Sequence, residues 1–183
     1  MCRMEQRLQS EVEKLLIKER LHELEMAYCR GIDRRDPELI RSIFFADAIE
    51  DHGDAWQGTG YEWVDYIFSG YLAQFEVTAH YVLNEWYKVE GDKAEGETHR
   101  ISYHRRPNGE EVTAGSRTFN RYECRDGVWR IAYRGVTRDW LRESRAAPPD
   151  PSQPRHMILR PSLPGPDDVS YRELPMFGRG PIW

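Results

Sequence analysis

Apolar residues recur at helical spacing over the first part of the chain. They predict one helix from about Glu5 to Arg30, which Gly31 is expected to end. Asp36 and Pro37 predict the start of a second, short helix, because aspartate caps a helix N-terminus and proline suits its first turn.

The pattern then changes from helical to extended. A short strand is predicted over residues 47–53, and a glycine-rich turn leads into a third helix that ends near Phe75. From about Val77 onward, four long β-rich runs are separated by turn pairs, of which Asn108-Gly109 and Asp126-Gly127 are typical of hairpins. Long antiparallel strands twist and curl, so we expect an α+β fold in which about three helices cover one face of a curled sheet and leave a hollow.

The C-terminal part has a different composition. Nine of the eleven prolines lie between Pro148 and Pro181, which excludes regular helix or sheet over that stretch. A disordered tail is one reading, but the stretch is rich in large apolar residues, so we expect part of it to pack on the domain, on a neighbouring subunit or over a pocket. We therefore divide the chain into a domain over 1–145 and an extended tail over 146–183.

Charge and motifs narrow the function classes. The net charge is −5 with no long basic run, which argues against a nucleic-acid partner. We expect no membrane span, and the three cysteines without a CxxC pair fit a cytoplasmic protein. No phosphate loop, dinucleotide fingerprint or Gly-x-Ser-x-Gly motif is present. Acid–base chemistry and simple binding are the classes that remain.

Several titratable residues are candidates for that chemistry. Tyr28 and Asp33 lie at the end of the first predicted helix, where a phenol and a carboxylate can polarise a substrate hydroxyl or carbonyl. His52, His80 and His104 lie on three separate predicted elements. Their spacing does not support a zinc site, whereas histidines near a carboxylate suit proton transfer at neutral pH. An ordinary ion pair with a neighbouring arginine is the alternative role for Asp33.

Four motifs occur in a familiar order: YCRGIDRRD, FADAIEDHG, TAHYVLN and DGVWRI. In this order and spacing the chain, from about residue 10 to 142, resembles the SnoaL-like branch of the nuclear-transport-factor-2-like superfamily, which includes the scytalone and bile acid dehydratases. The resemblance implies a cone-shaped mixed sheet packed on the helices. It does not extend to the tail.

The resemblance also implies roles for single residues. An Asp, a Tyr and a His form the proton-transfer network of those dehydratases, and these match Asp33, Tyr28 and His80 here. His104 matches a second titratable group of the network. His52 stands where scytalone dehydratase has a tyrosine, which suggests that an imidazole replaces a phenol.

A reaction follows from these matches. The resemblance implies elimination without metal or organic cofactor, in which His80, oriented by Asp33, removes a proton. Tyr28, His52 or His104 then protonates the leaving hydroxyl. Diarylpropane lyases of the superfamily expel formaldehyde in a related way, so the leaving fragment is expected to be water or a small molecule of that kind.

The substrate is expected to be a hydroxylated aromatic or polycyclic small molecule. Strand alternation places Arg100 on the same face as His104, where a guanidinium can hold a phenolate or a carboxylate. Aromatic walls suited to a flat ligand are expected from four residues: Trp56, Trp63, Tyr71 and Phe119.

Two other functions stay open. One is an isomerase similar to ketosteroid isomerase, with Asp33 as its base. The other is a non-catalytic binding or assembly module, which the cluster of titratable residues argues against. The resemblance implies a homodimer or homotrimer.

Overall fold

The computed structural model describes residues 3–146, 160 and 162–182. Three α-helices precede the four long strands of the sheet: α1 (Arg3–Asp33), α2 (Pro37–Ser42) and α3 (Gly60–Tyr66). The parts of the predicted tail that fall on 147–159, 161 and 183 lie outside the described residues. Within the described ranges, no helix is both long enough and apolar enough to cross a membrane.

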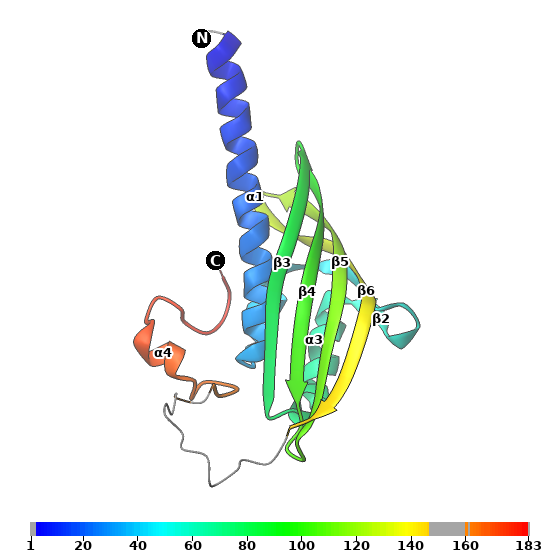
Figure 1. The fold of residues 1–183 in the computed structure, drawn as a ribbon. Helices are drawn as coiled ribbons and strands as arrows, with labels where there is room; N and C mark the ends of the chain where they lie inside the picture. The colour runs from blue at the N-terminus through cyan, green and yellow to red at the C-terminus, as the bar shows by residue number, and fades with distance from the viewer. Residues whose placement is uncertain (1–2, 147–159, 161, 183) are drawn as a thin grey trace.

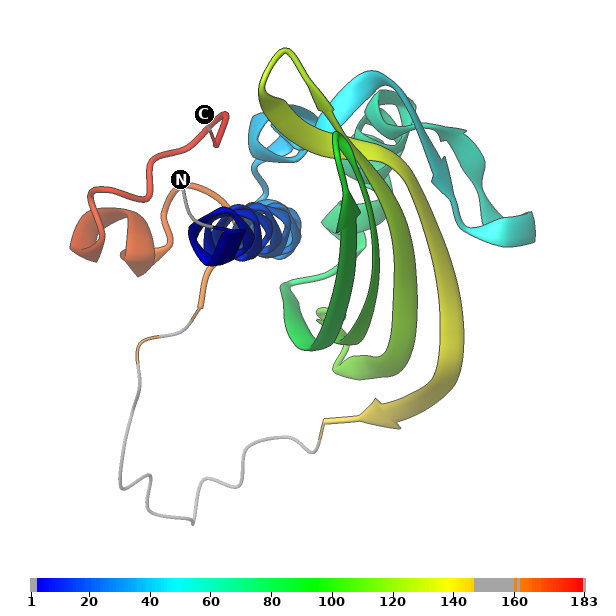
Figure 2. The same ribbon diagram turned by 90° about the horizontal axis from the view of Figure 1, so that it is seen from above.

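A six-stranded curled sheet forms the body of the domain (Figures 1 and 2). Its strands in spatial order are β2 (Gln57–Thr59), β1 (Phe44–Asp51), β6 (Val128–Arg145), β5 (Glu110–Arg125), β4 (Lys93–Arg105) and β3 (Val77–Glu90). β1 pairs with β6 in parallel and the other pairs are antiparallel. The predicted α+β class with a curled, mixed sheet is therefore confirmed, although β1 begins before the predicted 47–53.

The predicted end of α1 at Gly31 is wrong. Gly31 lies inside the helix, where a Cβ would stand 2.3 Å from Cγ1 of Ile40, so this glycine lets α2 approach α1 closely. The helix ends in a Schellman motif: the Asp36 N–H donates to the Gly31 carbonyl (2.8 Å) and the Arg35 N–H to the Ile32 carbonyl (3.3 Å). Arg35 takes the left-handed conformation with φ +53°, which costs a non-glycine residue about 1 kcal/mol.

The third predicted helix is interrupted. A capping box of Thr59 and Glu62 starts α3, but the regular α-helix ends at Tyr66. A π-helical turn over Ile67–Tyr71 and a short 3₁₀ helix over Leu72–Gln74 complete the segment. This irregular segment lies at the wall of the hollow between helices and sheet.

The core lies between the curled sheet and the C-terminal half of α1, with α2 and α3 closing the other sides. Leu21, Leu24 and Ile32 of α1 are buried there. The apolar positions of the first four turns, including Leu8 and Leu15, are exposed, because this half of α1 projects beyond the sheet (Figure 1). The spacing thus predicts the helix correctly, but only its second half contacts the core.

The described part of the tail, 162–182, packs on the side of α1 that faces away from the sheet (Figures 1 and 2). It includes a short helix, α4 (Val169–Glu173), capped by Asp168, so the prediction that this stretch holds no regular helix is wrong: no proline falls between Pro166 and Pro175. Asp168 is buried and its Oδ1 lies 3.3 Å from Nε of Arg34 on the α1–α2 connection. This segment therefore contacts the domain of its own chain.

Candidate active site

A cavity of about 420 Å³ lies in the hollow between the sheet and the helices. The inner faces of β3–β6 form one side, and α1 with the α3 segment forms the other. Its wall includes seven of the residues singled out from the sequence: Tyr28, His52, Trp63, Tyr71, His80, Arg100 and His104.

Asp33 and His80 form a two-point pair beside this cavity: His80 lines it, whereas Asp33 lies behind His80 and lines a second cavity between α1 and the C-terminal segment. The Asp33 Oδ2 accepts a hydrogen bond from the His80 backbone N–H (2.9 Å), and its Oδ1 lies 2.7 Å from the His80 Nδ1. A carboxylate accepts at Nδ1, which fixes the tautomer with a proton on Nδ1 and a lone pair on Nε2. Both side chains are largely buried, with 13% and 14% of their surfaces exposed. The pair therefore presents an oriented imidazole base.

His104 lies beside this pair. Its ring centroid is 5.3 Å from that of His80, edge to face, and 4.8 Å from that of Phe75. Burial, followed by the nearby charge of His80, lowers the pKa of His104 to about 4. His104 is therefore neutral at physiological pH and carries one ring N–H.

Tyr28 projects from α1 into the same cavity. Its hydroxyl accepts a hydrogen bond from Nε1 of Trp63 (3.1 Å). Burial raises the pKa of Tyr28 well above its ordinary value, so the phenol keeps its proton. The guanidinium carbons of Arg134 and Arg100 lie 3.5 Å and 5.0 Å from the centre of its ring. Tyr28 is thus a fixed, protonated hydroxyl near two cations.

Two buried ion pairs support the floor of the cavity. Glu25 of α1 contacts Arg100 of β4, and Glu50 of β1 lies 3.5 Å from Arg134 of β6. All four side chains are at most 4% exposed as residues. The Arg100 guanidinium is therefore already paired, which limits its predicted role in holding a phenolate or a carboxylate of the substrate.

His52 belongs to the second of these pairs. Its Nε2 lies 2.8 Å from Oε1 of Glu50, and its ring stacks on Trp63 with centroids 4.0 Å apart. His52 lines the cavity but pairs with Glu50, whereas His80 pairs with Asp33. Among the described residues, no group of three or more His, Cys, Asp or Glu side chains is placed to hold a metal ion.

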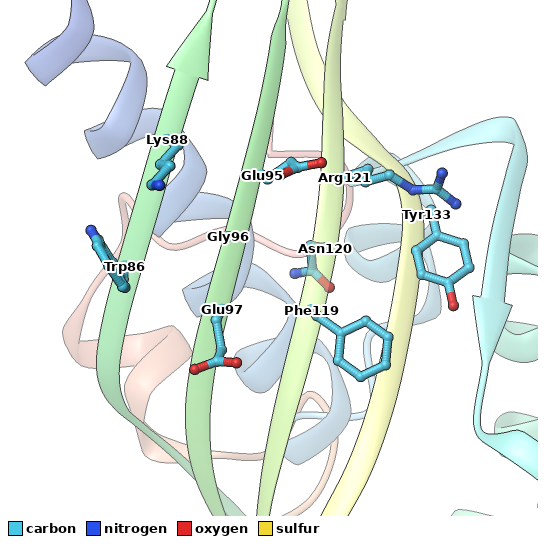
Figure 3. A pocket seen from close by; sticks show the side chains of 9 residues that line it. All are labelled: Trp86, Lys88, Glu95, Gly96, Glu97, Phe119, Asn120, Arg121 and Tyr133. Atoms are coloured by element: carbon cyan, nitrogen blue, oxygen red, sulfur yellow. The ribbon is translucent and has the colours of Figure 1, made fainter.

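The predicted aromatic wall is correct only in part. Trp63 and Tyr71 line the cavity, and Trp56 packs behind Trp63 with ring centroids 5.0 Å apart. Phe119 lies on the opposite, outer face of the sheet, in a groove with Trp86 and Tyr133 (Figure 3). Side chains alternate along β5, and the inward position belongs to its neighbour Thr118, so Phe119 faces away from the cavity and its predicted place in the wall is wrong.

The chain can now be compared with known proteins. A model of the SnoaL-like domain matches residues 13–135, which is more than half of the chain. The chain belongs to the SnoaL-like domain family. A search of curated proteins finds no match.

Solved structures support the fold of this SnoaL-like domain. A hexachlorocyclohexane dehydrochlorinase, LinA type 2, is 22% identical with a TM-score of 0.68, and the match covers 76% of this chain and 98% of that chain. The LinA type 3 enzyme from Novosphingobium barchaimii LL02 is 19% identical with a TM-score of 0.68, covering 76% and 99%. A scytalone dehydratase candidate from Novosphingobium aromaticivorans DSM 12444 is 16% identical with a TM-score of 0.65, covering 78% and 97%.

Sequence reasoning missed three of the four charged residues beneath the cavity of this SnoaL-like domain, all but Arg100. Glu25 lies one helical turn from both Leu21 and Tyr28, on the face of α1 that contacts the sheet. A charged residue on the core-facing stripe of a helix was therefore a usable signal. Arg134 and Glu50 lie on strands of mixed polarity, where one sequence gives no comparable signal.

The low pKa of His104 makes stability depend on pH. Its folded pKa of about 4 lies below the usual 6.5, so the unfolded chain takes up this proton first as pH falls. The stabilisation by neutral His104 is complete above about pH 6.5 and is lost between there and about pH 4. As pH falls through that window, the unfolding free energy of the unmodified protein should fall. The unfolding free energy of His104→Asn should fall by up to about 3 kcal/mol less. Urea titrations at a series of pH values test this, and parallel curves for the two proteins would contradict it.

Proposed function

We propose that this SnoaL-like domain is a cofactor-independent lyase that uses acid–base catalysis. It eliminates water, or a small fragment such as formaldehyde, from a hydroxylated aromatic or polycyclic small molecule. The observation that carries the proposal is the two-point Asp33–His80 pair, in which Asp33 orients the His80 imidazole at the cavity wall and leaves the lone pair of its Nε2 for a substrate proton. We also propose that the protein acts in the cytoplasm.

The base in this reaction is His80. Its Nε2 takes a proton from a substrate carbon, and the electrons of that C–H bond form the new double bond as the bond from carbon to the leaving group breaks. Asp33 accepts hydrogen bonds from the Nδ1–H and from the His80 backbone N–H, so the imidazolium that forms faces a fixed negative charge.

The leaving hydroxyl needs a proton to depart as water. Tyr28 keeps its phenolic proton because burial raises its pKa, so it is a protonated donor at the cavity wall. His104 is neutral, with one ring N–H, and its ring lies 5.3 Å from that of His80. His52 has less support as the donor, because its Nε2 is paired with Glu50.

The cavity fits a small aromatic substrate. Its volume lies in the range of pockets for small molecules, and Trp63, Tyr71 and Ile67 supply flat or apolar wall. Two of the structural neighbours are named for eliminations: a dehydrochlorinase and a scytalone dehydratase candidate. Their names support the reaction class and do not fix the substrate.

The isomerase alternative is less well supported. A ketosteroid-isomerase-like reaction would use Asp33 as the base, but both of its carboxylate oxygens are bound by His80. A non-catalytic module also has less support, because it needs no oriented imidazole beside neutral proton donors.

We also propose that the protein forms a homodimer or a homotrimer. Exposed aromatic side chains on the outer face of the sheet, such as Trp86, support this proposal.

A product assay tests the proposed reaction. We expect at least one member of a panel of hydroxylated aromatic diols to lose water or formaldehyde in the presence of the protein, as measured by mass spectrometry. Phe119→Leu, on the outer face of the sheet, should leave this turnover unchanged, whereas Tyr28→Phe should lower it by about 10²-fold. Equal turnover by the two variants would contradict the role of the cavity.

A further inference from the structure

We propose that Arg35 is a positioning residue, which sets the distance between Asp33 and His80, and that the C-terminal segment locks Arg35 in place. The inference rests on the proposed function, which gives the Asp33–His80 pair its catalytic role. The geometry of the link itself does not depend on which substrate the protein takes.

The first observation is the conformation of Arg35. It occupies the left-handed position of the Schellman motif that ends α1, where glycine is the usual residue because it lacks a Cβ. Arginine is therefore not a residue that this turn favours. A strained non-glycine residue persists where the surrounding contacts over-determine it, so the contacts of the Arg35 side chain are the next question.

The Arg35 side chain joins the two elements that carry the pair. Its Nη1 donates to the Ile32 carbonyl (2.6 Å), next to Asp33, and to the Thr78 hydroxyl (2.9 Å), two residues before His80. Its Nη2 reaches the Leu72 and Phe75 carbonyls, each at 3.3 Å, on the segment that leads into β3. One guanidinium thus ties the end of α1 to the beginning of β3.

Asp33 and His80 come from these two elements, and among the described residues no backbone ladder joins α1 to β3, which pairs with β4. Near the end of α1 the two hydrogen bonds of the Asp33–His80 pair link the elements directly; the His22–Glu85 pair (2.6 Å) links them about three helical turns earlier along α1. Because Thr78 is itself buried, its hydroxyl is a fixed anchor for the Arg35 guanidinium. The bridge therefore restrains the approach of the carboxylate to the imidazole.

The C-terminal segment holds the same turn from outside. Arg179 donates from Nη1 to the Arg34 carbonyl (3.0 Å) and from Nη2 to the Arg35 carbonyl (2.6 Å). The Gly180 N–H donates to Oδ2 of Asp36 (2.9 Å), and Asp168 pairs with Arg34. Three consecutive residues of the turn are thus bound by a segment that lies outside the matched family domain, residues 13–135.

Arg35→Gly separates the side chain from the backbone. Glycine adopts the left-handed conformation without strain, so the turn is retained while the bridge is removed. We expect kcat to fall about ten- to a hundred-fold with a smaller change in KM, because a small misplacement of a catalytic pair lowers the rate of the chemical step. Arg35→Lys, which keeps the charge and part of the bonding, should give an intermediate kcat, and Arg179→Ala a smaller loss.

A spectroscopic measurement needs no substrate. In protein labelled with ¹⁵N at histidine, the His80 Nδ1–H bound to Asp33 should give a downfield proton signal protected from exchange. We expect Arg35→Gly to broaden or abolish this signal and Arg35→Lys to weaken it. Asp126→Gly is the matched control, since Asp126 also has a positive φ (+52°) but lies in the β5–β6 turn away from the cavity; its signal and kcat should be unchanged.

The outcomes separate the two proposals. If Arg35→Gly or Arg35→Lys keeps both the protected signal and the full kcat, Arg35 does not position the pair and the inference is wrong. If Arg35→Gly loses the signal while His80→Ala retains turnover, the bridge stands and the proposed lyase function fails. Loss of the signal together with kcat in Arg35→Gly, with Asp126→Gly unaffected, supports the inference.

Discussion

His80→Ala lowers kcat/KM for the proposed elimination by about 10³-fold, within the range that removal of a general base gives. The variant removes the only imidazole among the described residues whose Nδ1 is bound by the Asp33 carboxylate, so no neighbouring group inherits its place. Tyr28 keeps its proton, and neutral His104 is a weak base because burial lowers its pKa to about 4, so neither side chain can replace His80 as the base.

Asp33→Asn should lower kcat/KM by a similar factor, but for a different physical reason. An amide presents one acceptor and one donor group, so it cannot accept from both the Nδ1–H and the backbone N–H of His80. One bond is lost or the imidazole takes the other tautomer, which places a proton on the Nε2 that should act as the base. Steady-state kinetics on a substrate found in the product assay measure both variants.

His99→Ala is the matched control for this pair of variants. His99 lies on β4, the strand that pairs with β3, but it is 41% exposed at its side chain and its Nε2 lies 3.7 Å from Glu97, on the outer face of the sheet. Its kcat/KM should stay within about two-fold of the unmodified protein. Full activity in both His80→Ala and Asp33→Asn would refute the proposed mechanism.

The strands and the face of β4 could be predicted from sequence because the signals are local. Turn pairs such as Asn108-Gly109 mark the hairpins, and alternation correctly places Arg100 and His104 toward the hollow. The same rule applied to β5 would have placed Phe119 outside, because Thr118 and Asn120 are buried on either side of it. Phe119 was assigned to the wall by residue type instead of by strand face.

The parts that could not be predicted depend on contacts between distant segments. Gly31 looked like a helix end because glycine commonly follows one, yet it serves a close contact with Ile40. The residue in the left-handed position is Arg35, and its reason lies in Thr78 and Leu72 on another part of the chain. No local pattern reports such a tertiary link, so the positioning of the candidate pair appears only in three dimensions.

Glu25→Ala should be the most destabilising single change at the cavity, with a loss of about 3–5 kcal/mol of unfolding free energy. Glu25 is fully buried on α1, pairs with Arg100 and accepts a hydrogen bond from the Tyr122 hydroxyl (2.7 Å). Its removal leaves a guanidinium in the core with no opposite charge and a phenol with one partner fewer. Desolvation makes such an uncompensated charge costly, whereas the intact pair itself adds little to stability.

A double-variant cycle tests whether the cost of losing Glu25 comes from the unpaired charge of Arg100. Arg100→Ala removes the orphaned charge, so Glu25→Ala combined with Arg100→Ala should be less destabilised than the sum of the two single variants. Glu19→Ala, on the exposed face of the same helix, should change the unfolding free energy by no more than about 0.5 kcal/mol. Urea unfolding followed by circular dichroism measures all four variants. Additive losses in the double variant would show that Glu25 acts by packing alone, and the buried ion pair would then have no part in holding Arg100 at the floor of the cavity.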